Sequence, residues 1–142
     1  MVTELLTGER LAARASEALA VPLQNALGVQ LLDRGDPPAG VWFVVADLAT
    51  NGAGGLHAAA LGAALELAAY LALIPQLAQA EHALTHAVAT QLVAAAHDGD
   101  RVEVRGAVDR RTRRLAFVSV VAAVDDRTIA RAQLTKSIVE RR

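Results

Sequence analysis

The sequence predicts an α+β fold in which one long central helix packs against a curved antiparallel sheet of five or six strands. Two observations lead to this prediction. The segment 56–73 has a helix-forming composition and only two strongly polar residues, His57 and Glu66. The second half of the chain consists of strand-like apolar runs separated by short turns. A curved sheet with a single helix lying on it is the simplest arrangement that covers such a helix.

Composition limits the classes of protein to consider. With 142 residues, 54% of them hydrophobic and 20% charged, the chain is expected to fold as one domain spanning residues 1–142. A net charge of −1 offers no field that would attract nucleic acid or an anionic membrane. The lack of cysteine excludes disulfides and a cysteine nucleophile. Together with a charged N-terminal region that does not resemble a signal peptide, it favours the cytoplasm.

The first half of the chain begins with a predicted amphipathic helix at 3–27. Leu11 and Leu19 belong to its apolar stripe and Arg14 to its polar face, Pro22 breaks or kinks it, and Gly28 ends it. The elements that follow are short: a strand at 29–32, a turn at 33–40, a strand at 41–48 and a glycine-rich loop at 51–55.

The second half is predicted to be β-structure. The segment 101–109 alternates cleanly between valine and charged residues, as a strand with one buried face does. The segment 115–124 is apolar on both faces, which indicates a central strand. Further strands are expected at 82–96 and 128–139, joined to these by tight turns.

The predicted helix at 56–73 is apolar on every side, so it must be buried in protein or in a bilayer. A carboxyl at mid-segment, Glu66, and the lack of a basic flank argue against the bilayer. One sheet covers only one side of the helix, and we expect a second copy of the chain to cover the other. The sequence therefore predicts a homodimer, or a dimer of dimers.

One stretch carries a family resemblance. From Asn51 to Glu66 it reads NGAGGLHAAALGAALE, with an amide side chain six residues before His57 and an acid nine residues after it. This pattern resembles the signature of hotdog-fold acyl-CoA thioesterases of the PaaI and hydroxybenzoyl-CoA type. The order of predicted elements is similar over nearly the whole chain, and the resemblance implies the hotdog fold.

The resemblance also implies an activity and roles for residues. It implies hydrolysis of an acyl-CoA thioester, with Glu66 as nucleophile or general base for water. The backbone N–H of Ala58 would hold the carbonyl oxygen, and Asn51 and His57 would orient the thioester or the loop. Such a role suits a helix N-terminus, whose free N–H groups point toward developing negative charge.

Helix geometry indicates how these residues can meet. Nine helical residues separate His57 from Glu66 by about 13.5 Å along the axis and place them on opposite sides of it. One chain's His57 and Glu66 therefore cannot share a small site. Antiparallel central helices in a symmetric dimer would bring Glu66 of one chain to Asn51, His57 and Ala58 of the other, the arrangement that similar enzymes use.

The chain departs from the family pattern at two points. Ala58 and Ala59 stand where the family has a glycine pair, and Tyr70 stands where relatives often have serine or threonine. Gly55, Ala59 and Tyr70 are expected to border the substrate. Two alternative functions remain open at this stage: a hotdog dehydratase or hydratase, and a non-catalytic acyl-ligand-binding or assembly protein that keeps the fold.

Two other groups of residues carry functional hypotheses. The cluster Arg110, Arg111, Arg113 and Arg114 is either a solvated turn or a site for the phosphates of coenzyme A. His82 and His86 have the spacing of a metal pair but no evident third ligand, so we expect neither a metal site nor a cofactor.

Overall fold

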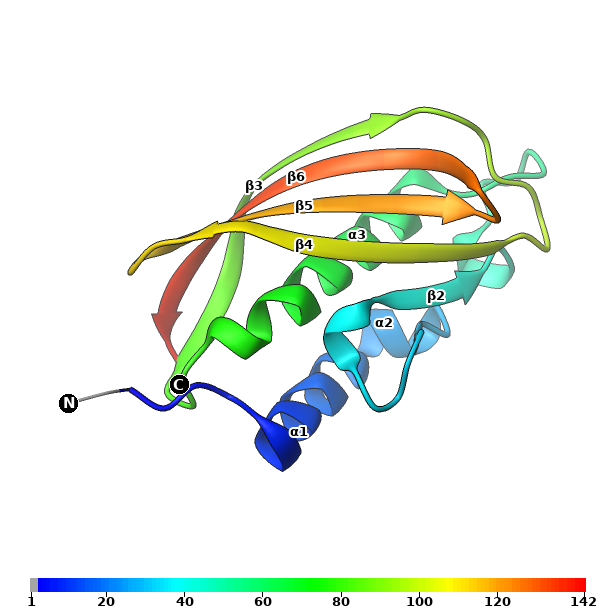
Figure 1. Cartoon of the computed structure of the whole chain (residues 1–142). Coiled ribbons are helices and arrows are strands. Elements are labelled where there is room, and N and C mark those ends of the chain that lie inside the picture. The colour runs from blue at the N-terminus through cyan, green and yellow to red at the C-terminus, as the bar shows by residue number, and fades with distance from the viewer. Residues whose placement is uncertain (1–2) are drawn as a thin grey trace.

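Helix α3 (Ala58–Leu73) lies between a curved antiparallel sheet and two short helices, α1 (Gly8–Leu19) and α2 (Pro22–Ala26) (Figure 1). The structure is a computed structural model that describes residues 3–142. The sheet has the strand order β1-β2-β4-β5-β6-β3. Its strands are β1 (Gln30–Leu31), β2 (Val41–Val44), β3 (Glu81–Leu92), β4 (Arg101–Arg111), β5 (Leu115–Val124) and β6 (Arg127–Glu140). This confirms the predicted α+β architecture.

The N-terminal helix differs from the prediction of one helix over 3–27. It begins only at Gly8, because the preceding residues extend along the loop before β3, where the Leu6 N–H donates to the Leu77 carbonyl at 2.8 Å. It ends at Leu19, and Pro22 starts the separate helix α2. Gly28 follows with φ +69°, a left-handed conformation that suits glycine after a helix.

Several other predicted elements are shorter in the structure, including the strand predicted at 29–32, which spans only Gln30–Leu31. The strand predicted at 41–48 ends at Val44, and the chain then turns through a 3₁₀ turn, η2 (Asp47–Ala49), so that the Ala49 carbonyl accepts the His57 N–H. The strand predicted at 82–96 ends at Leu92, because the next two N–H groups both turn to the Ile129 carbonyl. Helix α3 begins two residues later than predicted, since His57 is its N-cap.

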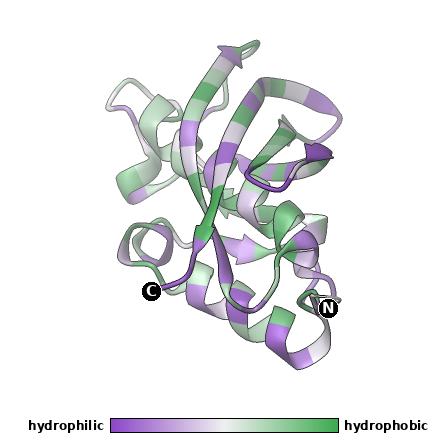
Figure 2. Ribbon diagram, turned by 90° about the vertical axis from the view of Figure 1, so that its left-hand side faces the viewer, coloured by the Kyte–Doolittle hydropathy of each residue, from purple (hydrophilic) through white to green (hydrophobic). Residues whose placement is uncertain are grey.

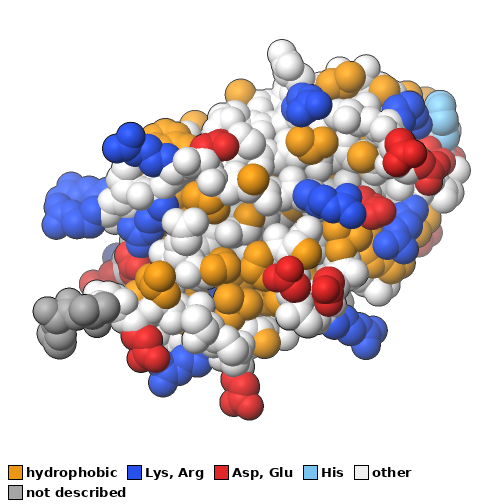
Figure 3. Space-filling view, viewed as in Figure 1, with side chains coloured by type: hydrophobic (Ala, Val, Ile, Leu, Met, Phe, Trp, Pro, Cys, Tyr) orange, Lys and Arg blue, Asp and Glu red, His pale blue; other side chains and the backbone are white. Residues whose placement is uncertain are grey.

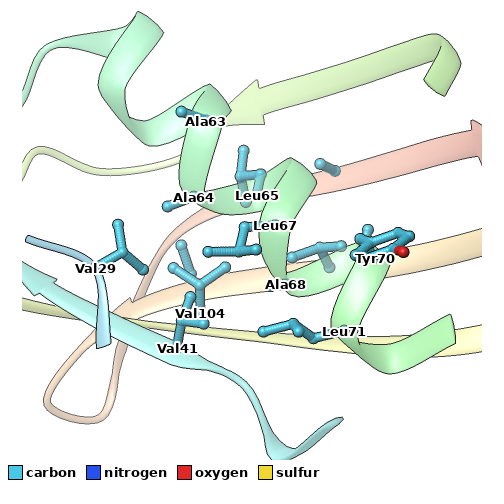
Figure 4. Packing of buried hydrophobic residues seen from close by; sticks show 14 of the residues in the cluster. Val29, Val41, Ala63, Ala64, Leu65, Leu67, Ala68, Tyr70, Leu71 and Val104 are labelled. Atoms are coloured by element: carbon cyan, nitrogen blue, oxygen red, sulfur yellow. The ribbon is translucent and has the colours of Figure 1, made fainter. Parts of the chain in front are cut away.

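Alternating residues of the strands point inward and supply the apolar side chains of the core. Figure 2 shows hydrophobic and hydrophilic residues alternating along the strands. In β5, every second residue is buried. Figure 4 shows Val41 of β2 and Val104 of β4 packed beneath α3, with the Tyr70 hydroxyl pointing away from them. A glycine at 106 in β4 allows this close packing, because a Cβ there would lie 2.9 Å from the Ala68 carbonyl oxygen.

Eleven of the sixteen residues of α3 are buried within this single chain. By length and composition alone, the helical segment Ala58–Gln76, which is α3 with the 3₁₀ turn η3 (Ile74–Gln76), could cross a membrane. However, 67% of its most apolar 18-residue window is buried inside the protein, as expected for a core helix.

Strand β3 is the least covered strand of the sheet. It lies at one end of the strand order, and most of its residues from Leu84 onward are exposed. Large apolar side chains are among them: Val88 is 47% exposed, Leu92 63% and the following Val93 57%. An uncovered apolar edge strand is a surface that proteins normally pair or protect.

Candidate active site

Glu66 lies half-buried on α3 beside a cavity of about 710 Å³. We call it the acid cavity, and define it by the polar and charged residues that line it: Arg14, Glu17, Gln24, Glu66, Tyr70, His82, Thr85, Lys136 and Arg141. Helices α1 and α3 and strands β3 and β6 all contribute. Residues far apart in the sequence thus meet around the one acidic residue of the central helix.

Lys136 is the only lysine of the chain and is 3% exposed. Its Nζ donates to Thr85 Oγ1 at 2.7 Å and lies 5.9 Å from the centre of the Tyr70 ring. Within residues 3–142, no carboxylate oxygen lies within 4.0 Å of this nitrogen. Burial lowers the pKa of Lys136 to about 8, and the attraction of Glu66 opposes that shift. The ammonium is therefore mostly charged at neutral pH.

Arg14 is the second buried cation, with 2% exposure. This corrects the prediction that it lies on a polar helix face. Its guanidinium donates to the main-chain oxygens of Glu81 and Gln79 at 2.9 and 3.0 Å, and more weakly to the Tyr70 hydroxyl at 3.4 Å. Its Nε has no partner among the described residues. These contacts attach α1 to the start of β3.

The Tyr70 hydroxyl continues this chain of contacts. It lies 3.1 Å from His82 Nδ1. A guanidinium can only donate, so the Tyr70 oxygen accepts from Arg14, and its proton is free for His82. Burial, followed by the charges of Arg14, Arg141 and Lys136, lowers the pKa of His82 below its ordinary 6.5. His82 is thus a neutral acceptor at pH 7.

The other half of the predicted site lies at the start of α3. Asn51 and Ala58 line a second cavity of about 390 Å³, which also contains Gly55, Leu92, Val93 and His97 and which we call the loop cavity. The Asn51 side-chain oxygen accepts the N–H groups of Ala53 and Gly55 at 2.7 and 3.2 Å. Asn51 therefore holds the loop in shape.

His57 has a clear local role. Its Nδ1 accepts the Ala59 N–H at 3.0 Å, which caps α3. The neighbouring Ala58 N–H has no acceptor within the described part of the chain and borders the loop cavity. A free N–H at a helix N-terminus is the feature that an oxyanion requires.

The two cavities share no lining residue. Glu66 and Tyr70 open into the acid cavity, whereas Asn51, Gly55 and Ala58 border the loop cavity. His57 and Ala59 are exposed at the start of α3. Within one chain, the structure therefore does not bring the predicted acid together with the predicted oxyanion donor.

The arginine cluster divides into two kinds of residue. Arg111 is half-buried and forms a bidentate ion pair with Glu81, with distances of 2.9 and 2.8 Å, and it also contacts the Gln76 carbonyl at 3.3 Å. Arg110, Arg113 and Arg114 are exposed. Figure 3 shows Lys and Arg side chains gathered at the end of the molecule where β4 turns into β5.

The comparison with family models identifies the protein's relatives. Residues 45–142 match the model of a fluoroacetyl-CoA-specific thioesterase, which is more than half of the chain and includes Glu66 and Lys136. The chain belongs to this thioesterase family. It is an acyl-CoA thioesterase, as the resemblance implied, and the family match favours hydrolysis over the two alternative functions. None of the curated proteins matches the sequence.

Solved structures confirm the hotdog fold. A thioesterase from Haemophilus influenzae superposes with a TM-score of 0.79 at 16% identity, over 99% of this chain and 96% of that one. The PaaI protein of E. coli superposes with a TM-score of 0.77 at 17% identity, over 91% and 94%. A hypothetical thioesterase from Streptococcus pneumoniae, solved with coenzyme A, gives 0.69 at 15% identity, over 80% and 88%.

The buried charge of Lys136 predicts a pH-dependent stability. A base whose pKa is lowered by folding destabilises the folded state at every pH below the folded pKa, and this cost fades as the pH rises toward the ordinary value of 10.5. We expect Lys136→Met to raise the melting temperature by several degrees at pH 7, because the buried charge is gone. The gain should shrink between pH 8 and 10.

Thermal unfolding followed by circular dichroism across this pH range measures the gain. Arg131→Met is the matched control, since Arg131 lies exposed on the same strand. Its melting temperature should stay within about a degree of wild type. A wild type more stable than Lys136→Met at pH 7 would contradict the assignment of Lys136 as a costly buried cation.

Proposed function

We propose that the protein hydrolyses acyl-CoA thioesters as a homodimer with two composite active sites, each using Glu66 of one chain and the Ala58 N–H of the other. One observation carries the proposal: these two groups open into different cavities of the same chain. If Glu66 is the catalytic carboxylate, it and an oxyanion donor must reach the same thioester carbonyl. The family takes its name from a thioesterase of fluoroacetyl-CoA, and that name supports coenzyme A as the leaving group.

Glu66 is the proposed catalytic carboxylate. As a general base it takes a proton from water, whose oxygen bonds to the thioester carbonyl carbon. The C–S bond then breaks, and the sulfur leaves as a thiolate that takes up a proton. As a nucleophile the carboxylate forms an anhydride that water then hydrolyses. In either route negative charge develops on the carbonyl oxygen, where the Ala58 N–H and the positive end of α3 stabilise it.

The placement of β3 supports this dimer. The acid cavity is lined by Leu84 and Thr85 near the start of β3, and the loop cavity by Leu92 and Val93 at its end. If two β3 strands pair antiparallel about a two-fold axis between Val88 and Ala89, Leu84 of one chain lies opposite Val93 of the other. Each acid cavity then adjoins the partner's loop cavity, and the exposed apolar residues of β3 become buried.

Two further assignments belong to the proposal. The exposed side chains of Arg110, Arg113 and Arg114 bind the phosphates of coenzyme A, whereas Arg111 is engaged by Glu81. The absence of cysteine from the chain supports a cytoplasmic location.

A charge on β3 should disrupt the dimer. We expect Val88→Lys to give a folded monomer with little thioesterase activity, because a lysine on an edge strand opposes pairing. Sedimentation velocity and circular dichroism measure the two properties. Val44→Lys, at another exposed strand valine that is 40% exposed, should leave the dimer intact. A wild-type enzyme that is active and monomeric would contradict the composite site.

Two variants that are each inactive alone should regain activity when they are mixed. Glu66→Gln removes the carboxylate and should lower kcat by about 100-fold or more. Ala58→Pro removes the N–H and should leave the helix intact, because proline is favoured at the first helical position and His57 already has an extended conformation, with φ −72° and ψ 125°. A mixed dimer then carries one intact site. An equal mixture after subunit exchange should regain about a quarter of wild-type activity, since half of the dimers are mixed.

Controls separate this result from misfolding. Ala58→Ser keeps the N–H and should retain activity. If Glu66→Gln hydrolyses thioesters at nearly the wild-type rate, Glu66 is not the catalytic carboxylate. If both variants are inactive and the mixture stays inactive despite proven exchange, the acid and the N–H do not act across the interface.

The arginine assignment is testable with a truncated substrate. Replacing Arg110, Arg113 and Arg114 together by alanine should raise KM for an acyl-CoA, because arginine pairs with phosphate. It should have much less effect on the matching acyl-pantetheine, which lacks the nucleotide. If steady-state kinetics show that KM rises equally for both substrates, the cluster is a solvated turn and not a phosphate site.

A further inference from the structure

The acid cavity holds more positive than negative charge. Six of its lining residues have side chains that can carry a charge near neutral pH: Arg14, Glu17, Glu66, His82, Lys136 and Arg141. Arg141 pairs with Glu17, so their charges cancel, and His82 is neutral because its pKa is lowered. Two cations, Arg14 and Lys136, and one carboxylate, Glu66, then remain in the lining, and the cavity carries a net charge of about +1 at pH 7.

Neither cation is neutralised by a carboxylate in contact with it. Within residues 3–142 neither Arg14 nor Lys136 forms an ion pair. The Lys136 ammonium has three donors and uses one of them, toward Thr85 Oγ1. A buried cation normally has a close counter-ion, because its desolvation is costly. The burial of Lys136 without a carboxylate in contact is expected of a site in which the ligand supplies the counter-ion.

We propose that the acyl group carries a terminal carboxylate that binds Lys136, so that the enzyme's substrates are ω-carboxyacyl-CoA thioesters. The inference rests on the proposed function, because it assigns the acyl group to the cavity that contains Glu66. The terminal carboxylate accepts hydrogen bonds from the free donors of Lys136, and Arg14 adds a favourable field. Binding brings the cavity's net charge close to zero. Glu66 repels the same carboxylate, which favours acyl chains long enough to keep the two anions apart.

The recognition step is testable without hydrolysis. S-(3-carboxypropyl)-CoA and S-butyl-CoA are thioethers of equal carbon number that the enzyme cannot hydrolyse, and they differ only at the chain end. We expect titration calorimetry to give a Kd about tenfold or more lower for the carboxylate compound, the gain of a charge-assisted hydrogen bond. Lys136→Met should abolish the preference, and Lys136→Arg should retain part of it.

Arg131→Met is again the control, because it removes an exposed positive charge from the same strand and should leave the preference unchanged. Equal binding of the two thioethers to the wild type would overturn the proposal. So would Lys136→Met weakening both thioethers equally, which would mean that Lys136 acts on Glu66 or on the fold instead.

Kinetics provide a second readout. The wild type should have a higher kcat/KM for succinyl-CoA than for butyryl-CoA, and Lys136→Met should reverse or remove that ratio. The binding measurement does not depend on Glu66 as catalyst. A carboxylate preference together with an active Glu66→Gln would therefore refute the catalytic assignment and leave this inference standing.

Discussion

The structure depends on the need to cover a helix that is apolar on every side. The sheet covers one side of α3, and α1 and α2 approach the other (Figure 1). The cover is incomplete beside Glu66, the single ionisable side chain in the middle of α3. A carboxylate in the wall of a partly enclosed cavity follows from that gap. Covering α3 also requires the sheet to pack closely against it. Gly106 allows this close approach, because it has no side chain where β4 passes the helix.

The elements that cover α3 also bring positive charge near Glu66. Arg14 comes from α1 and Lys136 from β6, the elements that border the cavity from two directions. Hydrogen bonds to carbonyl and hydroxyl groups lower the cost of burying these cations but leave their charges uncancelled. A site that served stability alone would have an apolar residue in place of Lys136. The retained charge is what the proposed recognition of a ligand carboxylate requires.

The parts of the structure that sequence predicted best are those decided by local pattern. Strand β5 has the predicted bounds, since turn residues lie immediately before and after its largely apolar run. Long-range contacts decided the rest: residues 5–6 pair with the loop before β3 instead of extending α1. The burial of the two cations had a signal in the sequence. Lys136 shares the inward alternation of Leu134 and Ile138, and Arg14 lies one turn from Leu11 in α1. Glu81, the partner of Arg111, had no such signal.

The helix length links the two halves of the proposed site. Nine residues carry the chain from the N-cap His57 to Glu66, about 13.5 Å along the axis, so no side-chain rotamer brings the two groups of one chain together. In the proposed dimer, a two-fold axis makes the second central helix antiparallel to the first, so that Glu66 of each chain lies beside the Ala58 N–H of the other. One interface then builds two identical sites. An insertion between Ala58 and Glu66 would misalign both proposed sites at once. The distance between these two residues is therefore constrained by how two chains pair, and not by either chain alone.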